Sequence, residues 1–365
     1  MLHFRLVEDK TKLEHPEIII EHWKTKLDKA KSLIDDIFSD DWSQKSGWYE
    51  MVKHLTRTLK HHKFDIKKRL GLSHSDKPKV FNLTETNYSG AFCKCIELLN
   101  FVGKKTFEKY RDKDEKDLMI RHFDNASLPG DFIRAGTVWT NAYDIPYDWR
   151  ASSLVNEDGK VEALTDRYGV LRNNPTKWLM SDTMNGDVLD PNNRQKMKEL
   201  LPWQPNLYTS DIGFRFSSYT NEEAEHYDFN KSQLELGLNV LSKGGIMITK
   251  HFLLFNQNSR DILTRLYTLF DEVHVVKPVT SKPDNSELYT VCIGYNYPGS
   301  SIDLPTDIEA PKLLFVHMIE AFTNSQISKI KSNVTRYSKY KFKNNRNEFN
   351  VQITNWIKKN LVCHK

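Results

Sequence analysis

The sequence predicts an α/β fold with a largely parallel sheet and helices on both of its faces. From about residue 116, short apolar segments alternate with segments of helical periodicity, an order typical of parallel sheets. Polar side chains lie at the ends of three predicted strands: Asp211, Lys250 and Glu287. Because α/β sheets bind ligands at the edge formed by the carboxyl ends of their strands, the sequence predicts a site at that edge.

The order of elements can be predicted along most of the chain. Residues 1–85 carry helical periodicity and predict a helical N-terminal layer, and a further helix is expected from Tyr88 to Tyr110. The main domain is expected to span residues 86–300. Its strands are predicted at 118–123, 148–154, 207–211, 246–252, 272–276 and 288–295, with a strand end and turn at 185–188. Its helices are predicted after the turn at 128–132 and at 194–201, 230–241 and 259–270. A short, turn-rich loop joins the last two strands, which favours antiparallel pairing.

Residues 301–365 are expected to form a helical, basic C-terminal extension. From Ile327 onward the chain has ten basic residues and one acidic residue, Glu348. Aromatic residues such as Tyr340 and Trp356 are interleaved with them. Basic side chains neutralise phosphates and aromatic faces stack on bases, so the segment suits RNA. A solvated, lysine-rich helix pair explains it equally well.

The composition sets limits on the class of protein. With 39% hydrophobic and 28% charged residues, the 365-residue chain is expected to be a soluble globular protein. No apolar run approaches the roughly 20 residues that cross a bilayer, and the N-terminus lacks the apolar core of a signal peptide. The four cysteines have no zinc-ligand spacing, so reduced thiols in an intracellular protein, and no metal site, are expected.

Two turns near predicted strand ends suit a nucleotide-like ligand. The Pro129-Gly130 turn brings bare backbone amides to the N-terminus of a helix, where anionic groups bind. Asp187 follows a later strand and could accept a hydrogen bond from an adenine amino group. Singly, acids such as Asp187 and Asp211 are more often helix caps or turn formers.

The segment Lys277–Cys292 is the most informative one. Its sequence, KPVTSKPDNSELYTVC, places Glu287 directly before a strand and behind a loop rich in Pro, Ser and Asn. So many turn formers before an apolar strand indicate a loop that holds a side chain in place.

The motifs together resemble the FtsJ-like ribose 2′-O-methyltransferases, in the branch that acts on mRNA caps. The segment around Glu287 resembles the last motif of that family, and GGIMITK, which ends at Lys250, resembles its "GG…K" strand. LYTSD, which ends at Asp211, resembles its aspartate strand, LPGDF (128–132) its cofactor loop and NGDV (185–188) its adenine-side turn. The resemblance covers residues 88–295 and extends to proteins of large DNA viruses that replicate in the cytoplasm, where we expect this protein to act.

The resemblance implies a Rossmann-like methyltransferase sheet, S-adenosylmethionine as cofactor, and capped RNA, with other capping or transcription components, as partners. The implied catalytic residues are Lys94, Asp211, Lys250 and Glu287. The implied cofactor-binding residues are Pro129, Gly130, Asp131, Ser152, Asp187 and Asp211. Lys282 and Ser286 are the implied substrate-binding residues.

The sequence departs from the family pattern at two positions. Asp131 replaces the second Gly of "PGGF", which puts a carboxylate beside the amino-acid end of the cofactor. That carboxylate could bind the α-amino group or repel the cofactor's own carboxylate. Ile212 stands where a Gly usually follows the catalytic Asp.

The four residue types suit the reaction. A ribose hydroxyl must be oriented toward the methyl group and must lose its proton. A lysine at its reference pKa of about 10.4 is protonated. A second ammonium and partial burial lower that pKa, so we expect the pair Lys94 and Lys250 to provide this setting. Lys250 is predicted to activate the hydroxyl, Lys94 and Glu287 to tune and position it, and Asp211 to steer Lys250 and the donor.

Two alternatives stay open at this point. The same chemistry could act on ribosomal or transfer RNA instead of a cap. The chain could also be an RNA-binding or assembly subunit on a methyltransferase scaffold that has lost activity, which Asp131, Ile212 and the basic C-terminus favour.

Overall fold

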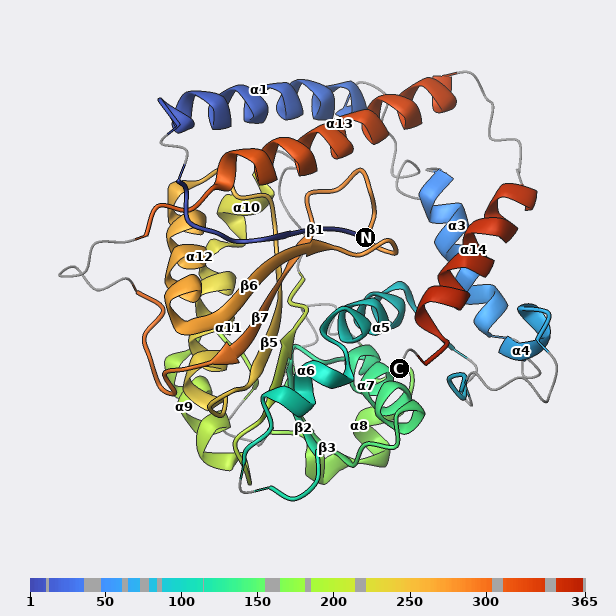
Figure 1. Cartoon of the computed structure of the whole chain (residues 1–365), viewed down its shortest axis with the longest axis vertical. Coiled ribbons are helices and arrows are strands. Elements are labelled where there is room, and N and C mark those ends of the chain that lie inside the picture. Colours follow the sequence, from blue (N-terminus) through green and yellow to red (C-terminus); the bar gives the residue numbers. More distant parts are fainter. Residues whose placement is uncertain are drawn as a thin grey trace.

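A computed structural model describes residues 1–10, 13–35, 47–60, 65–72, 79–83, 87–113, 115–154, 165–180, 185–213, 221–303, 311–338 and 346–363. Seven strands form one mixed sheet in the order β1-β6-β7-β5-β4-β2-β3 (Figure 1). The strands are β1 (Leu2–Arg5), β2 (Ile120–Asn125), β3 (Tyr147–Ala151), β4 (Leu207–Ser210), β5 (Ile246–His251), β6 (Phe270–Lys277) and β7 (Leu288–Tyr295). The predicted α/β fold is confirmed.

Parallel and antiparallel pairing divide the sheet into two parts. Strands β3, β2, β4 and β5 are parallel neighbours, whereas β7 pairs antiparallel with both β5 and β6. Because β7 runs against β5, its first residue lies at the edge where β4 and β5 end. The predicted antiparallel pairing of the last two strands is confirmed, and it brings Glu287 to the carboxyl edge.

Helices cover both faces of the sheet. The helices are α1 (Pro16–Asp35), α3 (Gly47–Leu59), α4 (Ile66–Arg69), α5 (Gly90–Val102), α6 (Lys104–Lys109), α7 (Asp131–Ala142), α8 (Val170–Asn173), α9 (Pro191–Leu200), α10 (Glu222–Glu225), α11 (Tyr227–Val240), α12 (Gln257–Leu269), α13 (Phe315–Ser338) and α14 (Arg346–Asn360). Side chains alternate between the faces along each strand. Met247 therefore joins the core with α11, α12, α1 and α13, while Ile246 and Ile248 join the core with α5, α7 and α14.

The two terminal segments pack against the main domain and against each other. Helices α1 and α13 lie side by side along one end of the molecule, and α14 lies beside α3 (Figure 1). The prediction of helices alone for the N-terminal layer is wrong at its start, because β1 pairs antiparallel with β6 and forms an edge of the sheet.

Two further local predictions need correction. The helix predicted from Tyr88 to Tyr110 is two helices, because Gly103 adopts a φ of 77° between α5 and α6 and ends the first. The segment at 185–188 is a turn without a strand, and residues 181–184 before it lie outside the described residues.

No helix in the described part of the chain is long and apolar enough to cross a membrane. The four cysteines are free thiols, three of them buried.

Candidate active site

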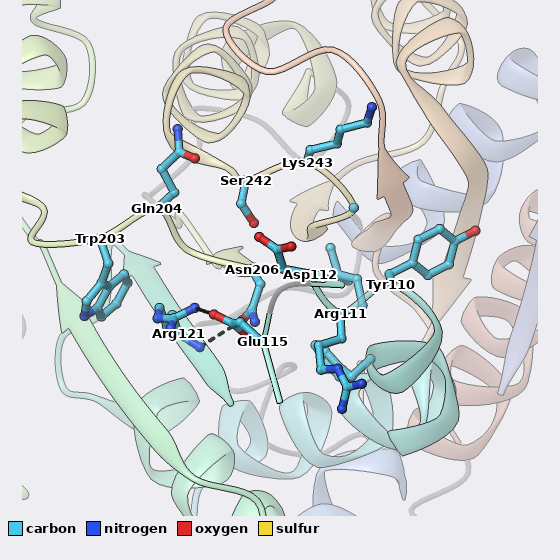
Figure 2. A pocket seen from close by; sticks show the side chains of 13 residues that line it. Tyr110, Arg111, Asp112, Glu115, Arg121, Trp203, Gln204, Asn206, Ser242 and Lys243 are labelled. Atoms are coloured by element: carbon cyan, nitrogen blue, oxygen red, sulfur yellow. Dashed lines mark hydrogen bonds and ion pairs between the residues drawn. The ribbon is translucent and has the colours of Figure 1, made fainter. Parts of the chain in front are cut away.

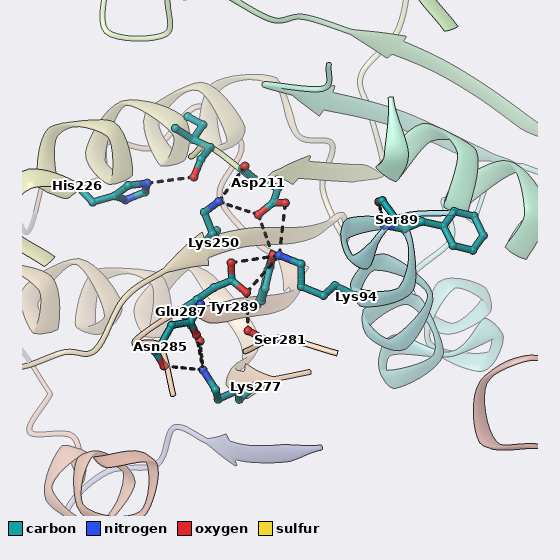
Figure 3. A network of polar contacts seen from close by, with 12 residues as sticks. Ser89, Lys94, Asp211, His226, Lys250, Lys277, Ser281, Asn285, Glu287 and Tyr289 are labelled. Atoms are coloured by element: carbon teal, nitrogen blue, oxygen red, sulfur yellow. Dashed lines mark hydrogen bonds and ion pairs between the residues drawn. The ribbon is translucent and has the colours of Figure 1, made fainter. Parts of the chain in front are cut away.

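Four charged side chains from distant parts of the chain meet at the carboxyl edge of the sheet (Figure 3). Lys94 projects from α5, Asp211 follows β4, Lys250 lies in β5, and Glu287 precedes β7. These are the four residues whose family motifs predict catalysis. We call them the tetrad.

The tetrad is an alternating chain of cations and anions. The Lys250 ammonium lies 3.0 Å from Oδ1 of Asp211 and also donates to the Asp211 carbonyl at 3.1 Å. The other carboxylate oxygen of Asp211 lies 3.8 Å from the Lys94 ammonium. Lys94 donates to both carboxylate oxygens of Glu287, at 3.2 and 3.1 Å. The four side chains are 9–18% exposed, so they are shielded from bulk water but not sealed from it.

Burial and ion pairing act in opposite directions on these charges. Burial lowers the pKa of Lys94, but the carboxylates of Asp211 and Glu287 together outweigh it and raise that pKa. Burial likewise raises the pKa of Glu287, yet Lys94, then Lys250, and a hydrogen bond from Ser281 keep that pKa below its usual range. The prediction of a lowered pKa is therefore wrong for Lys94. Lys94 is a fixed cation and cannot serve as a base near neutral pH.

Tyr289 joins the tetrad, although the motifs did not single it out. Its hydroxyl donates to Oδ1 of Asp211 at 2.8 Å, and the Lys94 ammonium lies 5.4 Å from the centre of its ring. Residues two apart on a strand face the same way, so its position after Glu287 at the start of β7 was a usable signal.

Pro129 and Gly130 form the turn that leads from β2 into α7. Gly130 is the N-cap of α7 and has a φ of 98°, a backbone conformation that residues other than glycine rarely adopt. A Cβ at this position would also lie 2.7 Å from a methyl group of Val170. The turn therefore requires glycine, both for its backbone and for the packing of α8 over it.

Asp131 is buried, and its charge is compensated inside the protein. Its carboxylate lies 3.1 Å from the Arg134 guanidinium and 3.8 Å from that of Arg167. Burial raises its pKa, against a hydrogen bond from Ser89 and the two arginines. Because the carboxylate already pairs with two arginines, contact between Asp131 and the cofactor stays a prediction. The loop presents no uncompensated negative charge to a ligand.

Hydrogen bonds join the last residues of β2 and β4 to the residue that follows β3. The Ser152 hydroxyl donates to the Asn125 side-chain oxygen at 3.0 Å, and the Asn125 amide donates to the Ser210 hydroxyl at 3.3 Å. Ser152 is fully buried, so its side chain links the ends of these strands beneath the surface of the carboxyl edge. Asp187 is exposed and accepts the backbone N–H of Leu189 at 2.9 Å, as a turn former does.

The second departure from the family pattern leaves the tetrad unobstructed. The Ile212 side chain is buried in the apolar core, 6% exposed. The next residue, Gly213, lies beside Lys250, where an added Cβ would be 3.1 Å from the ammonium. The chain thus has a residue without a side chain next to Lys250, one position later than the family pattern places it.

The two predicted substrate-binding residues lie in the loop before Glu287. Ser286 is buried and its hydroxyl accepts a hydrogen bond from Gln326 at 3.3 Å. It also lines a small cavity of about 90 Å³ between α1, α10 and the segment after β5. Lys282 is half-buried. Binding of substrate by either residue stays a prediction.

A larger cavity lies at the opposite edge of the sheet and contains no member of the tetrad. It has a volume of about 300 Å³ and is lined by residues at the amino ends of β2, β4 and β5, among them Arg121, Asn206 and Gly244 (Figure 2). Two of its charged groups, Arg121 and Glu115, form an ion pair. Within the described residues, no group of three or more His, Cys, Asp or Glu side chains could hold a metal ion.

Comparison with known proteins identifies the family that the main domain resembles. Residues 124–295 match the family of FtsJ-like methyltransferases. A probable methyltransferase of African swine fever virus is 34% identical over 185 residues, which cover 46% of this chain and 43% of that protein. A mouse protein named cap-specific mRNA (nucleoside-2′-O-)-methyltransferase 2 is 26% identical over 283 residues, 74% of this chain and 33% of its own. The chain thus spans less than half the length of these relatives.

Among solved structures, a ribosomal RNA methyltransferase of Plasmodium falciparum aligns with 55% of this chain and 96% of its own. The alignment has a TM-score of 0.36 and 15% sequence identity.

Proposed function

Because residues 124–295 form an FtsJ-like methyltransferase domain, as the motifs predict, we propose that the chain methylates a ribose 2′-hydroxyl of RNA. The methyl donor of such a domain is S-adenosylmethionine. The first transcribed nucleotide of a capped mRNA is the proposed substrate. One observation carries the proposal: residues as far apart as Lys94 and Glu287, 193 positions, meet in one charge-balanced cluster at the carboxyl edge.

Each member of the tetrad has a role that follows from its contacts. Lys250, as its neutral amine, is the group proposed to accept the proton of the hydroxyl, because the adjacent Gly213 has no side chain that would block a ribose there. Asp211 holds Lys250 through a carboxylate oxygen and a backbone carbonyl, so two contacts fix the direction of the Lys250 amino group. Lys94 stays charged and holds Glu287 with both of its oxygens engaged. Such preorganised charges require little rearrangement during reaction.

The same edge offers groups that fit the methyl donor. Bound there, S-adenosylmethionine would supply an already activated methyl group. The bare Gly130 turn at the N-terminus of α7 suits its amino-acid end, because Asp131 is neutralised by Arg134 and Arg167. Asp187, on the exposed turn after β3, suits the adenine amino group. Ser152 would act on the cofactor indirectly, by fixing the loop floor through Asn125.

The intact tetrad favours an active enzyme over a scaffold that has lost activity. Two of the relatives' names support the cap as the site of methylation, since the mouse and fly proteins are both called cap-specific mRNA methyltransferases. The basic extension remains compatible with RNA contact.

Labelled methyl transfer to matched capped and uncapped short RNAs tests the proposal, with the modified nucleotide identified after digestion. We expect label on the ribose of the first transcribed nucleotide and a marked preference for capped RNA. Equal labelling of uncapped RNA would exclude the cap as determinant. RNA binding without measurable affinity for S-adenosylmethionine would instead support the inactive scaffold.

A further inference from the structure

The loop that precedes Glu287 is held by helices that lie outside the methyltransferase domain. We call residues 278–286 the Glu287 loop. It follows β6 and contains little regular structure, yet it must place a carboxylate within hydrogen-bonding distance of Lys94. Three groups of contacts restrain it.

The first restraint is a buried carboxylate on α5. Glu97, 2% exposed, accepts the backbone N–H of Val279 at 2.6 Å and that of Thr280 at 3.0 Å. It also accepts the Thr280 hydroxyl at 2.6 Å and the indole N–H of Trp356, in α14, at 2.8 Å. Glu97 lies one turn of α5 after Lys94, so the helix that carries Lys94 also fixes the start of the loop.

The second restraint comes from α13. The Gln326 amide, 2% exposed, donates to the Asp284 carbonyl at 3.0 Å and to the Ser286 hydroxyl at 3.3 Å. Asn333, two turns later and 5% exposed, donates to the Asp284 carboxylate at 3.1 Å. Both side chains therefore hold the end of the loop, immediately before Glu287.

The third restraint belongs to the domain itself. The Lys277 ammonium, at the end of β6, donates to the backbone carbonyls of Asn285 and Glu287, at 2.9 and 2.8 Å, and to the Asn285 side chain at 3.0 Å (Figure 3). With these bonds, the loop is anchored at both ends and on two sides.

We propose that α13 and α14 are positioning elements for Glu287, acting through Gln326, Asn333 and Trp356. This inference rests on the proposed function. It gives a structural role to two helices whose basic composition alone suggests only contact with RNA or solvent. A displacement of about 1 Å at a catalytic group can cost about 100-fold in rate. Helices that fix Ser286 therefore set the rate without contacting the substrate.

The test compares two substitutions on the buried face of α13. Gln326→Leu removes the donor to the Glu287 loop. Thr323→Val, one turn earlier, removes a buried hydroxyl that makes no hydrogen bond to any described residue. We expect Gln326→Leu to lower kcat by about tenfold, with unchanged affinity for S-adenosylmethionine, and Thr323→Val to change kcat less than twofold. Equal effects of the two substitutions would overturn the proposal.

A second background separates positioning from general destabilisation. In Glu287→Gln protein, whose residual transfer is followed in long single-turnover reactions, the carboxylate to be positioned is already gone. Adding Gln326→Leu should then lower the rate less than twofold. The same tenfold loss in both backgrounds would contradict a role through Glu287.

A measurement that does not depend on enzymatic activity keeps the inference distinct from the proposed function. Trp356→Phe replaces the indole with a smaller aromatic ring and removes the N–H that binds Glu97. We expect amide hydrogen exchange at Val279 and Thr280 to accelerate at least fivefold, while exchange in β4 stays unchanged. If the wild-type chain transfers no methyl group, the proposed function fails, and this exchange result alone decides whether the helices restrain the loop. Unchanged exchange would overturn the restraint.

Discussion

The two edges of the sheet use charge in different ways. At the carboxyl edge, Lys94, Asp211, Lys250 and Glu287 come from four elements, and Lys94 and Asp211 each contact charged groups on two sides. At the amino edge, the larger cavity is lined by one charge pair between near neighbours in sequence, Arg121 and Glu115, six residues apart. The comparison teaches that convergence of buried charges, and not the size of a hollow, distinguishes the candidate site.

The largest expected difference between the edges is catalytic. Lys250→Ala should lower methyl transfer by about 10²- to 10⁴-fold, because it removes the proposed proton acceptor, and donor affinity should remain. The matched control is Lys243→Ala, which alters an exposed lysine of the amino-edge cavity and should change the rate less than twofold. Full transfer by Lys250→Ala would remove the carboxyl edge from consideration.

Asp124 provides a pH-dependent comparison. It is the second-last residue of β2, at the carboxyl edge, is 2% exposed, and burial raises its pKa to about 7. Since its unfolded pKa is about 3.9, the folded state binds more protons between pH 4 and 7, and stability falls as pH rises through that window. Asp124→Asn should therefore gain roughly 1–3 kcal/mol relative to wild type at pH 8 compared with pH 4.5, measured by urea unfolding.

An equal stability difference at both pH values would show that Asp124 does not titrate in this window. Its hydrogen bond from Thr209 is a contact that the substitution also alters, so Thr209→Val serves as control. That variant loses the hydroxyl but keeps the carboxyl group, and its stability should keep the pH dependence.

Tyr289→Phe tests the fifth member of the carboxyl-edge cluster. Asp211 would lose one donor but keep Lys250 and Lys94, so we expect kcat to fall about three- to tenfold, about the contribution of one ordinary hydrogen bond. The measurement is kcat at saturating RNA and donor. Tyr295→Phe, whose hydroxyl bonds the Leu238 carbonyl at the other end of β7, should leave kcat unchanged. A similar loss in both variants would point to strand stability instead.

The smallest effect is expected at the amino edge. The Asp148 carboxylate pairs with Lys177 and Arg150 and accepts the Trp203 N–H, and although burial opposes them, these contacts lower its pKa to about 2. Its stabilising contribution is present above its unfolded pKa and is lost as pH falls toward 2. Because the Asp148 side chain is still partly exposed, at 25%, Asp148→Asn should cost less than about 1 kcal/mol at pH 7, and 1 M salt should reduce that difference. A larger, salt-independent loss would contradict this assignment.

Sequence patterns located the main elements because apolar alternation and turn residues are local signals. Strand β7 has the predicted bounds, Leu288–Tyr295, and Lys94 lies beside Glu287 as its motif position implied. The four-residue strand β1 was missed because only its partner β6 distinguishes it from a coil. Glu97 was missed for a related reason. The role of a buried acid within an apolar helix face can be recognised only from the loop that it binds, which is distant in sequence.

The pairing of β1 has a consequence for the order in which the sheet is built. Leu2 pairs with Lys277, 275 positions later (277 − 2), so a ribosome that adds about 5–20 residues per second makes the two strands roughly 15–55 seconds apart. During that interval the segment has no strand to join. Once β6 emerges, β1 covers its outer backbone groups, which would otherwise offer a template to another chain. The strand that protects this side of the sheet from aggregation is thus synthesised early but joins the sheet late.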